Sequence, residues 1–186
     1  MTITPDNKDW TWVLSRPCPE CSFATQLHER QHISTMIRSN AELWCSALAQ
    51  PKPELRFRDE HWSILEYGCH VRDVYAVYQT RVHRMLTENG PHYDNWDQDI
   101  TARDDDYANQ DAADVARQLE AAAEVLALTF ESITSDYQWQ RTGFRSDGSS
   151  FTIESISRYM IHDTIHHLVD IGLTPTDAGA TSRNPA

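Results

Sequence analysis

Four stretches of the chain repeat apolar residues at intervals of three and four positions, the spacing of a helix with one buried face. They cover about residues 22–49, 59–89, 111–132 and 152–172. Helix-stopping residues lie between them, at Pro51, Pro53 and Gly90-Pro91. Glycine is scarce, with 6 residues in 186, and no stretch alternates polar and apolar residues as a strand does. The pattern therefore predicts an all-α chain whose four long helices form a four-helix bundle.

A chain of 186 residues suits one domain with a sizeable core. We expect an irregular N-terminal extension over residues 1–22 and the bundle over residues 23–173. Residues 174–186 are rich in Ala, Thr, Pro and Asp, so we expect a flexible tail. The acidic and aromatic connection from Gly90 to Gln110 is longer than joining two helices requires, and we expect it to pack near the open end of the bundle.

The net charge of −12 comes from 28 acidic and 16 basic residues, and it repels phosphate backbones and anionic membranes. No run of about 18 apolar residues is present, and the N-terminus lacks the layout of a signal peptide. Four unevenly spaced cysteines are too few for a disulfide scaffold. We therefore expect a cytoplasmic protein that acts on a small molecule, with no nucleic-acid or membrane partner. A homodimer is left open.

Histidine spacing gives the strongest indication of chemistry. His162 and His166 are four residues apart, so on a helix both imidazoles leave one face a turn apart. His70 borders the apolar stripe of the second stretch, and its imidazole would complete a three-nitrogen site. Such a site leaves a coordination position open for water or substrate, as catalytic metals require. We therefore predict that His70, His162 and His166 bind one divalent ion, although imidazole alone does not select the metal.

A second pair has the same spacing. Asp163 and His167 lie about a quarter turn further round the same helix, and they could be ligands instead or could orient the imidazoles. Chance also produces such pairs, since His28 and His32 have this spacing in a polar setting. The helical wheel excludes neither alternative.

Four further residues are candidates near this site. Tyr159 borders the histidine pair and could hold a substrate oxygen, and Asp73, one turn beyond His70, could accept its ring N–H; both are candidate catalytic residues. Trp96 and Asp97 in the long connection could wall the pocket and are candidate cofactor-binding residues. The plainer alternatives are core packing for Tyr159, a solvated charge for Asp73, and a solvated acidic loop for Trp96 and Asp97.

Cys18 and Cys21 form a Cys-x-x-Cys motif that could be half of a zinc ribbon, a redox pair or a local turn. A ribbon needs a second such motif, and a thioredoxin-like role needs a βαβ context; the sequence has neither. A local packing turn is the preferred interpretation, and a reducible disulfide or an accessory metal is the alternative. Cys69 points about 100° away from His70 on a helix, so we expect it to be a small buried residue.

The run Trp62-Ser63-Ile64-Leu65-Glu66 leads to His70, and a histidine pair follows late in the chain. This layout resembles the DinB and YfiT-like superfamily, which includes mycothiol-dependent maleylpyruvate isomerase and bacillithiol transferases. The resemblance covers roughly residues 23–173. It implies a bundle in up-down-down-up order with a metal at its open end, and use of a low-molecular-weight thiol.

The residues and the resemblance together suggest a divalent-metal-dependent enzyme, with zinc or nickel preferred as the metal. Thiol-dependent S-transfer or isomerisation of a small electrophilic molecule is the leading hypothesis. A metal-dependent hydrolase is the first alternative, because an ion with an open position also activates water. A non-catalytic protein that binds a metal or small ligand is the second.

Overall fold

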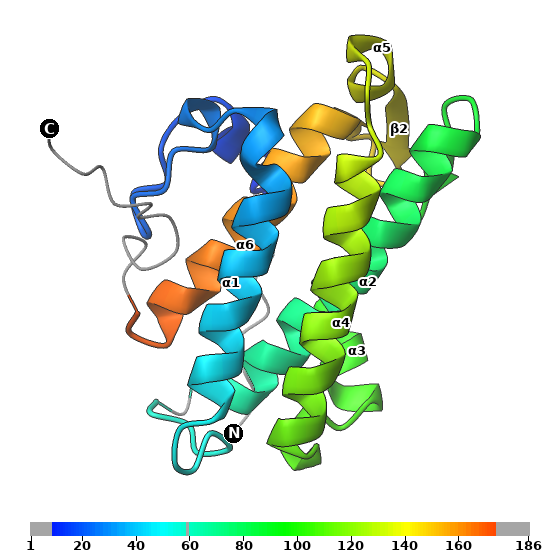
Figure 1. Ribbon diagram of the computed structural model, residues 1–186. Helices are drawn as coiled ribbons and strands as arrows, with labels where there is room; N and C mark the ends of the chain where they lie inside the picture. The colour runs from blue at the N-terminus through cyan, green and yellow to red at the C-terminus, as the bar shows by residue number, and fades with distance from the viewer. Residues whose placement is uncertain (1–8, 59, 174–186) are drawn as a thin grey trace, which may run out of the picture.

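The computed structural model describes residues 9–58 and 60–173, so the predicted tail at 174–186 lies outside the described residues. Four long helices dominate it (Figure 1), and α4 packs against both α1 and α2. Their bounds are α1 (Ile33–Leu48), α2 (Ile64–Thr87), α4 (Ala112–Glu131) and α6 (Ile153–Asp170). The mostly helical architecture expected from the sequence is therefore confirmed.

Short helical elements connect the long ones. They are the 3-10 helices η1 (Thr11–Leu14), η2 (Thr25–Leu27), η3 (Arg30–His32) and η4 (Tyr107–Asn109) and the α-helices α3 (Gln98–Asp104) and α5 (Asp136–Trp139). The first predicted helix was too long, because Ala24, His28 and Glu29 adopt extended backbone conformations that interrupt it. Residues 22–32 therefore belong to an irregular N-terminal segment that lies beside α6.

A small sheet corrects the strictly all-α expectation. Strand β1 (His92–Tyr93) pairs in parallel with β2 (Thr142–Arg145), and β2 pairs antiparallel with β3 (Ser150–Thr152). Strands of two to four residues are too short to show an alternating pattern in the sequence. At Gly143 a side chain would meet those of Met85 and Tyr93 at 2.8 Å, so glycine lets β2 lie closely on α2.

A buried polar network seats α6 against α1 and α2. The Thr164 carbonyl on α6 accepts hydrogen bonds from Trp44 Nε1 at 3.2 Å and from Asn40 Nδ2 at 3.3 Å, both on α1. The Tyr75 hydroxyl on α2 donates to Asn40 Oδ1 at 2.6 Å. All four residues are buried, so breaking one bond would leave polar groups unpaired away from water. The network therefore fixes how α6 is rotated about its axis.

A capping box begins α2 about two turns before His70. The Ser63 hydroxyl accepts from the Glu66 backbone N–H at 3.1 Å, and the Glu66 carboxylate accepts from the Ser63 N–H at 2.8 Å. Arg56 Nε also donates to that carboxylate, at 2.9 Å. Trp62 packs against His70 with ring centroids 5.4 Å apart. The Trp-Ser-x-x-Glu run thus positions the start of α2 and the histidine that follows.

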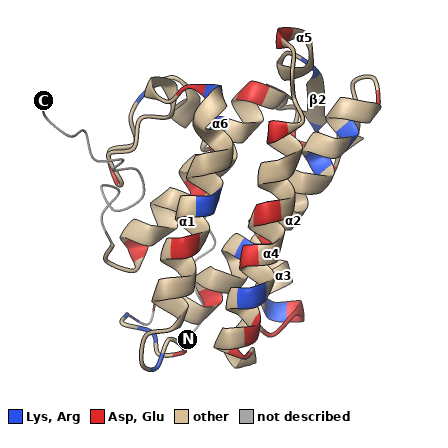
Figure 2. Cartoon of the chain, viewed as in Figure 1, with Lys and Arg blue, Asp and Glu red and all other residues tan. Residues whose placement is uncertain are grey.

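Acidic residues occur on all four long helices, with arginines between them (Figure 2). Arg38 of α1, for example, bridges Glu124 and Glu131 of α4 at 2.7 and 2.5 Å. Within the described part of the chain, none of the helices combines the length and apolar character that crossing a bilayer requires.

Substituting Ser63→Ala should lower the free energy of unfolding by about 1–2 kcal/mol, because it removes a buried N-cap and leaves the Glu66 N–H without its acceptor. Ser46→Ala is the matched control, since Ser46 is exposed and only donates to the Glu42 carbonyl within α1. Urea denaturation followed by circular dichroism measures both. Equal losses for the two variants would show that the capping box does not set the start of α2.

Candidate functional site

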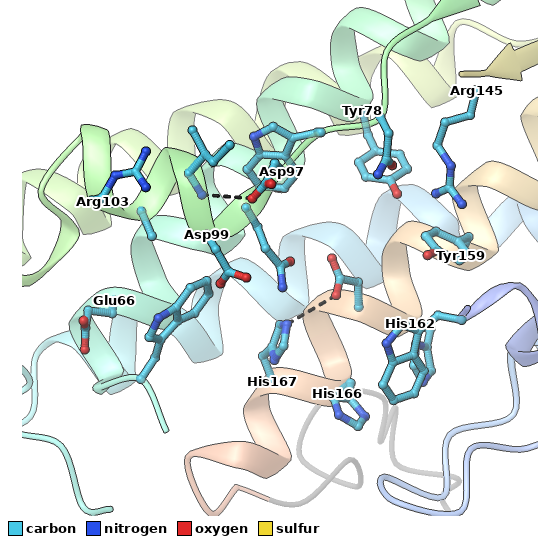
Figure 3. Close-up of a pocket in the computed structure, with 18 of the residues that line it drawn as sticks. Glu66, Tyr78, Asp97, Asp99, Arg103, Arg145, Tyr159, His162, His166 and His167 are labelled. Atoms are coloured by element: carbon cyan, nitrogen blue, oxygen red, sulfur yellow. Dashed lines mark hydrogen bonds and ion pairs between the residues drawn. The ribbon is translucent and has the colours of Figure 1, made fainter. Parts of the chain in front are cut away.

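A cavity of about 1240 Å³ opens beside α6 (Figure 3). The N-terminal segment, α2, the connection before α4 and the β2–β3 hairpin supply its other walls. Figure 3 shows His162, His166 and His167 near one another on α6, and Arg145, Tyr78 and Tyr159 together on another side of the cavity. The residues that line it therefore offer imidazole, carboxylate, phenol and guanidinium groups to one open cavity.

The first candidate metal site combines His70 of α2 with Asp163 and His167 of α6. One ligand atom from each residue lies within 4.8 Å of the other two. Asp163 Oδ2 is 3.5 Å from His70 Nε2, and its Oδ1 is 3.3 Å from His167 Nε2. His167 Nδ1 is bonded to Asp170 Oδ2 at 2.7 Å, which orients the imidazole so that Nε2 faces Asp163.

His70 shows that a metal suits this site. Its side chain is fully buried, yet neither ring nitrogen has a hydrogen-bond partner among the residues that the structure describes. Trp96 stacks on the ring with centroids 5.4 Å apart and an angle of 5° between planes. An unpaired buried nitrogen costs free energy unless it binds something, and two imidazoles with one carboxylate are ligands for divalent transition ions. Three protein ligands would leave at least one coordination position open.

Protonation couples the members of this group. Burial disfavours charge on His167, but hydrogen bonds to Asp163 and Asp170 outweigh it and raise the pKa of His167 to about 9. Burial also acts to raise the pKa of Asp163, but its contacts with His167 and His70 hold that pKa well below the ordinary value. Burial lowers the pKa of His70, which stays neutral. A metal ion must therefore displace a proton from His167.

The second candidate group combines Cys18 and Cys21 with His162 and His166. All four residues are buried, and one ligand atom from each lies within 4.8 Å of the others. Both cysteines are free thiols. Burial lowers the pKa of His162 to about 4 and raises the pKa of Cys21 to about 12, so these groups are uncharged near neutral pH.

The structure does not bring His70, His162 and His166 together in one ligand group. His70 lies with Asp163 and His167, the pair that the sequence left open as alternative ligands. The division follows from helix geometry, since pairs offset by one residue leave α6 about 100° apart. On the helical wheel, apolar residues flank the His162/His166 pair and the Asp163/His167 pair alike. Only the contacts that α6 makes in the structure show which pair lies beside His70.

Asp73 and Tyr159 differ in their relation to the cavity. Asp73 accepts hydrogen bonds from Arg72, at 2.8 Å, and from the Tyr107 hydroxyl rather than from a ring nitrogen of His70. The suggested contact with His70 is therefore wrong, because the Asp73 carboxylate is directed towards Arg72 and Tyr107 instead. Tyr159 lines the cavity, and burial raises its pKa, so it keeps its proton and can donate a hydrogen bond.

Trp96 and Asp97 both line the cavity, as the long connection was expected to do. Trp96 also donates from Nε1 to Thr101 Oγ1 at 2.8 Å, and Asp97 caps α3 by accepting from the Ile100 N–H at 2.9 Å. Both side chains therefore help to fold the connection into a helix that closes one side of the cavity. Whether either contacts a cofactor stays a prediction.

Four arginines that were not predicted from the sequence also line the cavity: Arg56, Arg81 of α2, Arg103 of α3 and Arg145 of β2. Arg145 is paired with Asp147 at 2.7 Å, and its guanidinium lies 5.6 Å from the centre of the Tyr159 ring. Arg81 donates to the Asp94 carbonyl at 2.9 Å. No sequence signal indicated Arg145, because the short strand that carries it was not predicted.

The family model for the DinB superfamily matches residues 35–171. This chain belongs to the DinB superfamily. The resemblance inferred from Trp62 to His70 and from the late histidines is therefore confirmed.

A solved DinB-like structure, YfiT from Bacillus subtilis, is similar to this chain, with a TM-score of 0.67 and 16% sequence identity over 86% of this chain and 95% of YfiT. YfiT is described as a probable metal-dependent hydrolase with an unusual four-helix bundle topology. At this identity the likeness shows that the DinB chain has the four-helix bundle fold. No curated protein matches the chain.

In the metal-free protein, nuclear magnetic resonance of the imidazole nitrogens should show His167 titrating near pH 9 rather than near its ordinary value of about 6.5. Because the folded pKa lies above the unfolded one, the stability from this ion pair is complete below about pH 6.5 and is lost as the pH rises towards 9. Asp163→Asn should shift the titration downwards. An ordinary pKa for His167 in the folded protein would show that Asp163 and Asp170 do not hold its proton.

Proposed function

We propose that this DinB protein is a metal-dependent enzyme that uses a low-molecular-weight thiol. It would either transfer the thiol sulfur to a small electrophilic molecule or isomerise that molecule. His70, Asp163 and His167 would hold the ion, with zinc or nickel preferred. The observation that carries the proposal is the fully buried His70, which lies beside a carboxylate and a second imidazole and whose ring nitrogens have no hydrogen-bond partner within residues 9–58 and 60–173. When bound, a divalent ion supplies a Lewis acid that acidifies a thiol or a water placed beside it.

The proposal includes the up-down-down-up order of the superfamily. In Figure 1 the colour advances in the same direction along α2 and α4, which supports this order. The connection between them, residues 88–111, is then a crossover that spans the bundle, and Trp96 and Asp97 of this crossover line the cavity. The crossover brings the chain back to the end of the bundle where α2 began, and it also supplies a wall of the site.

The size of the cavity favours a reaction of two molecules. Pockets for one small molecule measure about 300–1,000 Å³, whereas this cavity measures about 1240 Å³. In S-transfer, the thiol sulfur bonds to the electrophilic carbon, the bond from that carbon to its leaving group breaks, and the thiol proton leaves with that group. Holding both molecules in one cavity raises the rate of this step by proximity.

Other residues that line the cavity would orient the electrophile. Tyr159, which keeps its proton, would donate a hydrogen bond to a substrate oxygen. The guanidinium groups of Arg81 and Arg145 line the same cavity and would attract a carboxylate or another oxygen-rich group. Trp62 and Trp96 supply the apolar contact expected for a small organic substrate.

Hydrolysis is the second candidate, and the description of YfiT as a probable metal-dependent hydrolase favours it. The same ligands and the same cavity would then serve a single substrate and water. A homodimer remains a prediction.

Substituting His70→Ala should remove about one equivalent of metal per chain and abolish the metal-dependent reaction of a thiol with a haloarene. The helical content should remain, because the core stripes do not depend on this imidazole. His83→Ala is the matched control, since His83 is an exposed histidine on the same helix. Metal analysis, circular dichroism and the rate with metal and thiol present together or singly measure these effects.

A rate with thiol and metal together that equals the sum of the separate rates would contradict thiol transfer and leave hydrolysis. Unchanged metal content in a folded His70→Ala protein would contradict the metal site itself. Should His70→Ala fail to fold, His167→Gln tests the same site from α6, where the side chain contacts Asp163, Asp170 and the Tyr67 ring.

A further inference from the structure

The Cys-x-x-Cys turn and the first histidine pair of α6 approach each other with the dimensions of a tetrahedral metal site. Cys18 Sγ lies 3.8 Å from His166 Nδ1, and Cys21 Sγ lies 3.7 Å from His162 Nε2. Around tetrahedral zinc, with sulfur at about 2.3 Å and nitrogen at about 2.0–2.1 Å, a sulfur and a nitrogen are about 3.6 Å apart. Both measured distances are therefore close to the tetrahedral value, and all four ligand atoms lie within 4.8 Å of one another.

The turn that carries the two cysteines is built to present them together. Ser22 adopts the left-handed conformation, with φ of 61°, and its N–H donates to the Cys18 carbonyl at 2.8 Å. The Cys18 N–H donates to the Phe23 carbonyl at 2.9 Å. A residue other than glycine keeps this conformation only where surrounding interactions impose it. The tight turn directs both sulfurs to the same face of α6.

The surroundings of His166 also match those of a ligand. While Nδ1 faces Cys18, Nε2 lies 3.7 Å from Glu20 Oε2 and 3.9 Å from Asp170 Oδ2. Histidines that bind metals usually direct their other ring nitrogen to a carboxylate, which fixes the tautomer. Trp10 lies against both imidazoles, with centroids 5.0 Å from His166 and 5.6 Å from His162.

We propose that Cys18, Cys21, His162 and His166 form a structural zinc site, separate from the site at His70, that anchors residues 9–32 to α6. Two thiolates and two imidazoles are a donor set that selects zinc among the common divalent ions. Because protein ligands fill all four tetrahedral positions, the ion has no position open for a substrate. Its role is to join segments that are about 140 residues apart in the sequence.

This site would shape one wall of the cavity, because His162 and His166 both line it. His162 and His166 alternate along α6 with Asp163 and His167 of the other site, and Trp10 lines the cavity. Removing the zinc should loosen the N-terminal segment but not the bundle core, since the hydrogen bonds from Asn40 and Trp44 to Thr164 lie elsewhere on α6.

Cobalt substitution of the full-length protein tests the proposal without a variant. Tetrahedral coordination by two thiolates should give a thiolate-to-cobalt charge-transfer band in the near ultraviolet and intense visible bands. His70→Ala should retain both, which separates this proposal from the proposed function. Cys18→Ser and Cys21→Ser should lose them, whereas Cys45→Ser, a half-buried cysteine of α1, should keep them.

Zinc affinity, measured in the His70→Ala background by competition with a chromophoric chelator, should fall more than about 100-fold in Cys18→Ser and His166→Asn. This loss exceeds the 10–100-fold loss of metal affinity that follows when a residue hydrogen-bonded to a metal ligand is removed. Hydrogen exchange should rise over residues 10–28 when zinc is removed. Three results would overturn the proposal: no thiolate band in the wild-type cobalt protein, zinc affinity in Cys18→Ser equal to that in Cys45→Ser, or a Cys18–Cys21 disulfide in protein purified without oxidant.

Discussion

The hydrogen bonds from Asn40 and Trp44 to the Thr164 carbonyl determine which way each side chain of α6 points. With Thr164 held against α1, helical geometry at about 100° per residue turns Asp163 and His167 towards one side and His162 and His166 towards a neighbouring face about 100° away. His70 of α2 receives the first pair, and the N-terminal segment covers the second. Because these bonds are buried, a rotation of α6 would leave polar groups without partners and would dismantle both groups at once.

The two groups differ in the chemistry that they allow. The His70 group has three ligands, borders a large cavity and lies beneath Trp96, so an ion there would keep a position for a substrate. The cysteine group has four ligands and would be closed. A DinB bundle that carries one candidate metal site on one face of α6 can thus use the neighbouring face to hold the N-terminal segment. Trp10 of this segment then contributes to the wall of the cavity.

Much of the bundle could be predicted because α1, α2, α4 and α6 are amphipathic and are bounded by proline, glycine and capping residues. The sheet could not be predicted, since its strands are too short to show a period. Residues 22–32 were wrongly predicted to be helical, because apolar spacing alone does not reveal the extended conformations of Ala24 and Glu29. The late histidines were recognised as a candidate site, but the choice between the two pairs depends on the rotation of α6. The role of Cys18 and Cys21 depends on a contact with α6 that no local pattern encodes.

Anomalous diffraction from crystals of the zinc-loaded protein, recorded on both sides of the zinc absorption edge, tests most directly whether α6 serves two separate sites. Our account predicts two anomalous peaks per chain, one among His70, Asp163 and His167 and the other among Cys18, Cys21, His162 and His166. A single peak shared by His70, His162 and His166 would contradict it, because α6 would then have to be rotated away from the setting that Asn40 and Trp44 impose.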